Sequence, residues 1–173
     1  MKTLPPTIAF ALKFIIYFAV LMSCFEASRG TAVERFVVED CILKPTIELI
    51  HIAAPREPIR LVGRTISSPS SHLRITRGCE GVEIFLLLLS AIAAFPASWK
   101  AKARGLAIGF ITSYLLSVCR LIALHFTLRY SPAAWESLHG LILPLGPIVL
   151  ITLYFIHWTS SIPLASVQTS HAS

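Results

Sequence analysis

The sequence predicts an all-α polytopic membrane protein with about four transmembrane helices and a small extracytoplasmic segment that contains a helix and a hairpin. Two observations support this fold class. Of the 173 residues, 55% are hydrophobic and only 14% are charged, whereas about 25% of the residues in a soluble domain are charged. The apolar residues are also grouped into long runs, and a run of about 18 residues or more can cross the hydrocarbon core of a bilayer.

The first apolar run covers residues 7–24 and is interrupted only by Lys13. Its length is near the lower limit for a transmembrane helix. A cleaved signal peptide is the alternative, because a basic start and an apolar centre are followed by small residues at Ala27 and Ser28. We therefore interpret residues 1–24 as an N-terminal transmembrane helix or a signal peptide.

Residues 25–78 form a long polar stretch that we expect to lie outside the cytoplasmic membrane. Residues 42–54 have the apolar spacing of an amphipathic helix, with Ile47, Ile50 and Ala54 on one stripe. Two β-like runs, at residues 59–66 and 72–75, are separated by a turn-rich Ser/Pro segment. We expect a hairpin that lies on the membrane and leads the chain into Cys79.

Residues 79–158 are expected to form a three-span catalytic core. The spans are placed at residues 82–98, 106–128 and 141–158, where the apolar runs are found. The remaining residues, 159–173, are rich in Ser, Thr, Ala and His and are interpreted as a loose cytoplasmic tail.

The sidedness of the spans follows from residues 99–105, which carry Lys100, Lys102 and Arg104 and no acidic residue. We expect this short segment to be a loop between two spans, and by the positive-inside rule the loop is cytoplasmic. Residues 25–78 then lie outside despite their eight basic residues. The same stretch has six acidic residues, and long loops obey the rule less strictly than short ones.

This topology brings three reactive side chains to the outer face of the membrane. Cys79 lies in Gly-Cys-Glu-Gly at the outer end of the second span. Arg120 lies about 22 Å along the third span at 1.5 Å per residue, and thus in the outer half of a core about 30 Å thick. His139 begins the fourth span, again on the outside.

A cysteine, an arginine and a histidine at one level of the bilayer suit acyl transfer. The thiolate is the nucleophilic form of cysteine, but an ordinary thiol is mostly protonated at neutral pH. A nearby imidazole can accept the thiol proton and return it to a leaving amine. A fixed guanidinium can stabilise the negative charge of the thiolate or of the acyl-transfer intermediate.

Each of these side chains also has an ordinary structural interpretation. A cysteine at the end of a span is often just a small apolar residue. Arg120 can pair with Glu83 or extend toward the membrane surface. His125 is expected on the opposite face of the helix from Arg120, Arg129 is expected to extend to the interface, and Cys119 to take part in packing.

The sequence predicts no metal and no cofactor. Its four cysteines and six histidines are scattered, without the paired spacing of a zinc site. Nucleotide-binding glycine motifs do not occur. The net charge of +6 would suit nucleic acid, but membrane topology accounts for three of the basic residues, so we expect membrane lipids and no nucleic acid as partners.

The order of these residues resembles the exosortase/archaeosortase family, in which Gly-Cys-x-Gly precedes a span, an arginine lies inside the next outward span, and a histidine stands just before the last. The resemblance extends from about Leu61 to Trp158. The segments from Gly78 to Glu83 and from Ala94 to Lys100 look especially like the compact exosortases of the H type.

The resemblance implies a cysteine endopeptidase/transpeptidase of the bacterial inner membrane, with its active site facing the extracytoplasmic side. It implies substrates that are exported proteins with a C-terminal motif, a transmembrane helix and a basic tail. Cys79 would be the nucleophile, Arg120 the charge stabiliser and His139 the acid/base, with a thioester acyl-enzyme as intermediate. Glu80 and Ser117 stand where the family commonly has asparagine. The alternative is a non-enzymatic four-helix adaptor or a small transporter subunit.

Overall fold

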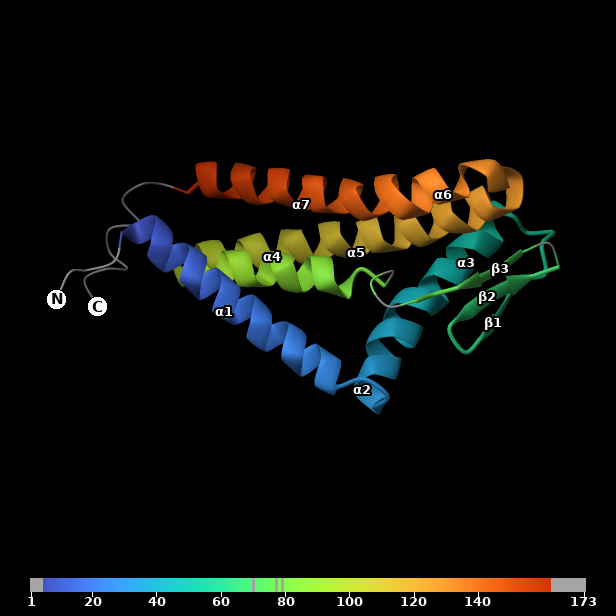
Figure 1. The fold of residues 1–173 in the computed structure, drawn as a ribbon, viewed down its shortest axis with the longest axis horizontal. Helices are drawn as coiled ribbons and strands as arrows, with labels where there is room; N and C mark the ends of the chain where they lie inside the picture. Colours follow the sequence, from blue (N-terminus) through green and yellow to red (C-terminus); the bar gives the residue numbers. More distant parts are fainter. Residues whose placement is uncertain (1–4, 70, 77, 79, 163–173) are drawn as a thin grey trace.

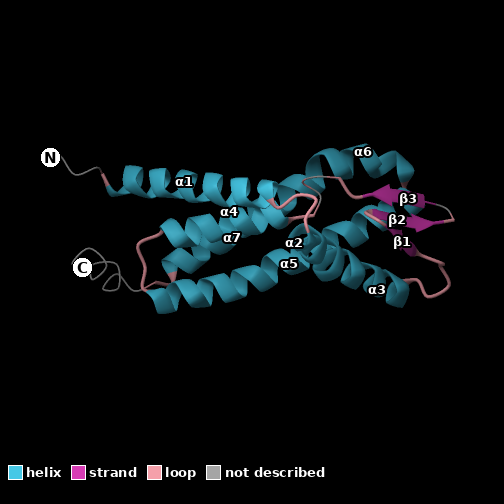
Figure 2. Cartoon of the chain, turned by 90° about the horizontal axis from the view of Figure 1, so that it is seen from below, coloured by secondary structure: helices cyan, strands magenta, loops and turns pink. Residues whose placement is uncertain are grey.

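The structure, a computed structural model, describes residues 5–69, 71–76, 78 and 80–162. Within these ranges the chain is an elongated bundle of helices with a small sheet at one end, while both termini lie at the other end (Figures 1 and 2). We call these the sheet end and the terminus end. The principal helices are α1 (Pro6–Ala27), α4 (Val82–Ala94), α5 (Trp99–Tyr130) and α7 (Leu143–Ser160).

Three helices of the described chain are long and apolar enough to cross a membrane, namely residues 6–27, 99–130 and 132–160. This is the organisation of a helical membrane protein. The predicted count of about four is not confirmed, because the span expected at residues 82–98 is the shorter helix α4. Its 13 residues rise about 20 Å, which is less than the bilayer core. The helix ends because Phe95, with ψ of 136°, precedes Pro96, and a proline disfavours helical backbone at the residue before it.

The prediction of a loop at residues 99–105 is wrong, because this basic segment forms the first turns of α5. The side chain of Ser98 accepts a hydrogen bond from the N–H of Ala101 at 3.4 Å and so caps the helix. With 32 residues, α5 is about 48 Å long. It therefore extends well beyond a bilayer core of about 30 Å.

The amphipathic helix predicted at residues 42–54 is part of a longer helical run. This run comprises α2 (Ala32–Arg35), the π-helical segment η1 (Phe36–Leu43) and α3 (Lys44–Ala53). Pro45 stands at the first turn of α3, where its missing N–H is tolerated. Ile47 and Ile50 are buried as the pattern predicts.

The predicted hairpin is a three-stranded antiparallel sheet of β1 (Arg60–Val62), β2 (Thr65–Ser68) and β3 (Ser71–Arg74) in that order. The extra strand arises because Gly63, with φ of +59°, turns the first β-like run back on itself. Ile66 lies opposite both Leu61 and Leu73 in the register.

Two hydrophobic cores stabilise the two ends of the bundle. At the sheet end, aliphatic side chains of η1, α3, the sheet and α5 are buried together, among them Leu43, Ile50, Ile66 and Leu121. At the terminus end, α4, α5 and α7 bury Leu88, Ile92, Ile151 and Trp158. Between α5 and α7, the chain turns at the sheet end through η2 (Pro132–Ala134), α6 (Trp135–Ser137) and η3 (Leu138–Ile142).

Candidate functional site

The predicted nucleophile, Cys79, lies outside the described residues, but its neighbours Gly78, Glu80 and Gly81 are described. Gly78 has φ of +79° and Gly81 has φ of +81°. Only glycine adopts this left-handed backbone without strain. The two glycines of the motif are therefore required by the backbone on either side of position 79.

Arg120 joins the middle of α5 to this segment. Its Nη1 donates a hydrogen bond to the carbonyl oxygen of Gly78 at 3.2 Å, and the residue is only 6% exposed. The guanidinium thus faces the protein interior, one residue away from position 79. The alternative pairing with Glu83 is not the arrangement found, since a carboxylate oxygen of Glu83 lies 3.7 Å from Arg29.

Ser117, one turn before Arg120, lies directly against Gly81. A β-carbon added to Gly81 would be 2.0 Å from the Ser117 Oγ and 2.8 Å from its Cβ, which is closer than packed atoms approach. The backbone at Gly81 therefore touches α5, and both positions must remain small. Arg120 and Ser117 together fix the ends of the segment from Gly78 to Gly81 on one face of α5.

Glu80 is fully buried beside two arginines from distant parts of the chain. Its Oε1 lies 3.2 Å from Arg64 Nη1 and 3.4 Å from Arg29 Nη1. Arg29 lies two residues after the end of α1, and Arg64 stands in the turn between β1 and β2. The negative charge that Glu80 brings next to position 79 in the sequence is thus partly compensated by these two guanidinium groups.

The same two arginines hold Glu34 more closely than they hold Glu80. Oε1 of Glu34 is 2.6 Å from Arg64 and 3.1 Å from Arg29, and the N–H of Gly30 donates to its Oε2 at 2.6 Å. The Gly30 N–H bond and the two arginines lower the pKa of Glu34 to about 2. Burial, followed by the charge of Glu83, instead raises the pKa of Glu80, and within the described residues its Oε2 has no hydrogen-bond partner.

His139 lies in η3 at the sheet end, in the turn that leads into α7. Its imidazole stacks on the indole of Trp135, with ring centroids 5.0 Å apart and planes inclined by 10°. Trp135 in turn packs against the sheet-end core. The imidazole therefore belongs to the same end of the bundle as Arg120 and Gly78.

A second buried charged cluster was not predicted. Glu57 lies 3.6 Å from His125 Nε2 and forms an ion pair with Arg129. The pairing of Arg129 with Glu57 was not expected, and Cys119 is exposed rather than packed. The sequence does contain a signal for this cluster. His125 and Arg129 are four residues apart and so lie on one face of the helix, and basic side chains inside a span require an acidic partner.

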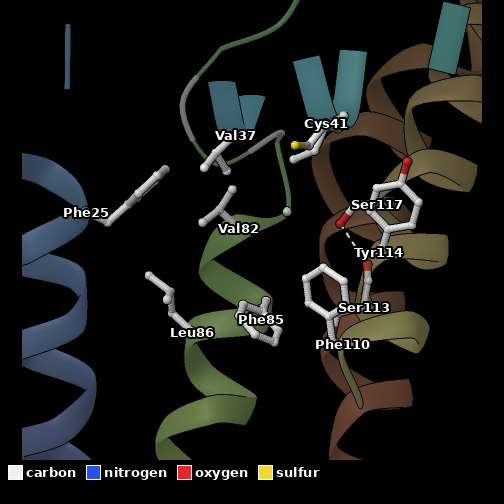
Figure 3. A pocket seen from close by; sticks show the side chains of 12 residues that line it. Phe25, Val37, Cys41, Val82, Phe85, Leu86, Phe110, Ser113, Tyr114 and Ser117 are labelled. Atoms are coloured by element: carbon white, nitrogen blue, oxygen red, sulfur yellow. Dashed lines mark hydrogen bonds between the residues drawn. The ribbon is translucent and has the colours of Figure 1, made fainter. Parts of the chain in front are cut away.

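An apolar cavity of about 370 Å³ lies directly below Gly81 and Ser117, between α1, η1, α4 and α5 (Figure 3). The figure shows Phe25 on the α1 side, Val82 and Leu86 on α4, and Ser117 on α5. Twelve residues line it: Phe25, Val37, Cys41, Ile42, Gly81, Val82, Phe85, Leu86, Phe110, Ser113, Tyr114 and Ser117. Several of them are partly exposed, so the cavity opens on the side of the bundle.

Among the described residues, no group of three or more His, Cys, Asp or Glu side chains is arranged to hold a metal ion. Comparison with protein-family models, with curated proteins and with solved structures finds no match for this chain. A function for this protein must therefore be inferred from the geometry around Gly78 and Gly81.

Proposed function

We propose that the chain is a membrane cysteine endopeptidase/transpeptidase of the exosortase type, which cleaves C-terminal sorting signals of exported proteins. The observation that carries this proposal is the contact between the buried Arg120 and the carbonyl of Gly78. A charge inside a span is costly and needs a partner or a task. Here it binds the backbone carbonyl of Gly78, the residue that precedes Cys79 in the sequence.

The proposed reaction begins when His139 accepts the thiol proton of Cys79. The sulfur then attacks the scissile carbonyl carbon, and the positive charge of Arg120 stabilises the resulting oxyanion. The C–N bond breaks, the imidazolium returns the proton to the leaving amine, and the substrate remains as a thioester. Water, or an amine or hydroxyl of an acceptor, attacks the thioester and restores the thiol.

The network around Glu80 supports this chemistry at a position where the family commonly has asparagine. An uncompensated carboxylate beside Cys79 would raise the pKa of the thiol. Arg29 and Arg64, at 3.4 and 3.2 Å from Glu80, offset that charge. The departure from the family pattern is thus compatible with a reactive thiolate.

Substrate processing tests the proposal directly. The chain is produced together with exported proteins of the same genome that end in a shared motif, a transmembrane helix and a basic tail. We expect cleavage with the wild-type chain and none with Cys79→Ala, while the matched variant Cys119→Ala, at an exposed cysteine of α5, remains active. Normal processing by Cys79→Ala would end the proposal.

Thiol reactivity distinguishes the enzyme from a non-enzymatic adaptor or transporter subunit. A membrane-impermeant alkylating reagent added from the extracytoplasmic side should modify Cys79 at near-neutral pH faster than it modifies Cys24 or Cys41. Equally slow modification of all three would favour the adaptor. Modification only from the cytoplasmic side would contradict the proposed orientation.

A further inference from the structure

The terminus end of the bundle carries positive side chains without acidic ones. It is formed by the start of α1, the end of α4, the start of α5 and the end of α7 (Figure 1). All nine acidic residues of the chain lie in other segments. The lysines and arginines of these described segments are Lys13, Lys100, Lys102 and Arg104. The segments themselves therefore supply no carboxylate side chain to pair with these cations.

The sheet end is different, because basic side chains there form ion pairs with buried glutamates. Arg29 and Arg64 pair with Glu34, and Arg129 pairs with Glu57. Nζ of Lys102 instead donates a hydrogen bond to the backbone carbonyl of Ala93 at 2.7 Å. A carbonyl is a neutral partner, so the positive charge of this lysine remains uncompensated.

Lys13 and Lys102 line the same cavity, which has a volume of about 260 Å³. The cavity lies between α1 and the corner at residues 95–98, where α4 gives way to α5. Lys13 is seven residues after Pro6, or about 10 Å along α1, and a charge at such a depth is costly unless it finds a partner or reaches the interface. Two positive side chains that line one cavity also repel each other. A negatively charged group between them would remove both costs.

A second cavity beside the first is apolar. It has a volume of about 200 Å³ and lies between α1, α4 and α7, with Leu88 and Phe155 in its wall. Phe10 lines both cavities, so they adjoin at this side chain. A charged cavity next to an apolar one fits a ligand with an anionic head and a hydrocarbon chain. A free anion would use only the first of the two.

From these observations we infer that the cavity between α1 and the α4–α5 corner binds the phosphate of an anionic phospholipid, with Lys13 and Lys102 beside the phosphate and an acyl chain next to Phe10. Basic pockets between transmembrane helices bind such headgroups. The positive-inside rule assigns this basic end to the cytoplasmic leaflet, whose surface is negatively charged. The inference does not depend on the proposed cysteine chemistry.

The lipid would also connect two parts of the fold. No residue of α1 is buried, so this helix has few interior contacts that hold it in place. A phosphate between Lys13 of α1 and Lys102 of α5 would hold α1 against the α4–α5 corner. Binding should therefore raise the unfolding temperature of the folded chain.

Direct titration tests the site. The full chain is purified in an uncharged detergent and titrated with phosphatidylglycerol at about 0.15 M salt, and the bound lipid is counted by native mass spectrometry. Phosphatidylcholine, whose headgroup has no net charge, and inorganic phosphate are the comparison ligands. We expect one phosphatidylglycerol per chain to bind at least about tenfold more tightly than phosphatidylcholine, because both lysines attract its charge.

Charge substitutions locate the bound lipid. Lys13→Gln and Lys102→Gln should each weaken binding by about fivefold, because each removes one positive charge from the cavity. Lys13→Arg retains the charge and should bind as the wild type does. The matched controls Lys100→Gln and Arg104→Gln remove the same charge at exposed positions of α5 outside the cavity, and they should change binding by less than about twofold.

Three results would overturn the inference. Equal weakening in all four glutamine variants would show a diffuse attraction to the basic end, and equal binding of the two lipids by the wild type would show that charge is not recognised. Displacement of phosphatidylglycerol by inorganic phosphate at similar concentrations would show an anion site and contradict the lipid assignment. The side chain of Lys13 is exposed, so Lys13→Gln should unfold near the wild-type temperature without lipid, which separates lost binding from lost folding.

Discussion

The two ends of α5 pack in opposite ways. At the terminus end, glycines of α5 have no side chain to keep its neighbours away, and side chains of α4 and α7 occupy the space beside them. A β-carbon added to Gly105 would lie 2.4 Å from Nε1 of Trp158, and one added to Gly109 would lie 2.4 Å from Cδ2 of Leu88. At the sheet end, polar side chains of α5 reach out instead, as Arg120 does to Gly78 and Arg129 does to Glu57.

This difference follows from the side chains that each end of α5 supplies. Inside a bilayer the hydrophobic effect does not drive helices together, so association depends on close packing through small residues. A charged side chain that is buried in such a helix must be paired. The terminus end is therefore held together by close packing of helices, and the sheet end also by pairing of charged side chains.

The largest expected effect separates Arg120, which binds the Gly78 carbonyl, from Arg129, which pairs with Glu57 on the same helix. Arg120→Gln should lower the cleavage rate by about 10² to 10³-fold, because it removes the positive charge at the developing oxyanion. Arg129→Gln should lower the unfolding temperature but leave the cleavage rate of the folded protein nearly unchanged. Added guanidinium should partly restore the activity of Arg120→Gln, which a merely structural loss would not allow. Equal losses of activity in both variants would show that Arg120 has no role in cleavage beyond the structural one expected for Arg129.

The glycines of the two ends should respond differently to alanine. Gly81→Ala should cost about 3 kcal/mol, because it combines left-handed backbone strain with a clash against Ser117. Gly109→Ala should cost about 1 kcal/mol or less, because the end of the Leu88 side chain can move and alanine favours the helix. Unfolding temperatures in detergent measure both effects. The double variant Gly81→Ala/Ser117→Gly should recover the part due to the clash.

The acidic residues that lie near Arg29 and Arg64 should also differ in how much they contribute to stability. Glu34→Gln should cost about 2 kcal/mol, because it leaves buried guanidinium charge without its nearest partner. The pKa of Glu34 is lowered from 4.5 to about 2 in the folded protein, so its contribution is full above pH 4.5 and is lost as the pH falls toward 2. Glu83→Gln, which changes a carboxylate 3.7 Å from Arg29, is the matched control with a smaller effect.

Glu80 should show the opposite dependence on pH. Because its pKa is raised on folding, its ionisation costs the folded state free energy as the pH rises above 4.5. Glu80→Gln should therefore stabilise the protein relative to wild type as the pH increases. Unfolding temperatures of both proteins across this range measure the effect, and parallel curves would contradict it.

The smallest effect is expected for Ser117→Ala. The hydroxyl of Ser117 donates to the carbonyl of Ser113 within its own helix, and such a bond adds little to helix stability. The free energy of unfolding should change by less than about 0.5 kcal/mol. A larger loss would show that the hydroxyl, and not only the small size of this residue, supports Gly81.

Several features of the fold were readable from the sequence, and some were readable but missed. The amphipathic spacing predicted buried Ile47 and Ile50, and the apolar runs predicted long helices. The end of α4 at Phe95 could have been inferred from Pro96, and this would have shortened the second span. The helical start of α5 could have been inferred from Ser98, a favoured N-cap residue.

The meeting of Cys79, Arg120 and His139 in one site stays a prediction, because Cys79 lies outside the described residues. The structure adds the contact of Arg120 with the Gly78 carbonyl. The partners of Glu80 were not predicted, because Arg29 and Arg64 are 51 and 16 residues away along the chain. No periodic pattern links such positions, so their contact depends on how α1, the sheet and α4 pack.

The sequence by itself determined the membrane class of this protein, its apolar helices and the position of its chemistry-bearing residues along the chain. These properties follow from local hydrophobicity and from the fixed rise of a helix. Only the tertiary structure decided that Arg120 holds the Gly78 carbonyl, that Arg29 and Arg64 compensate Glu80, and that Glu57 pairs with Arg129. The physical reason is that several acids and bases in the chain can pair with one another, and burial selects the partners that packing brings within a few ångströms.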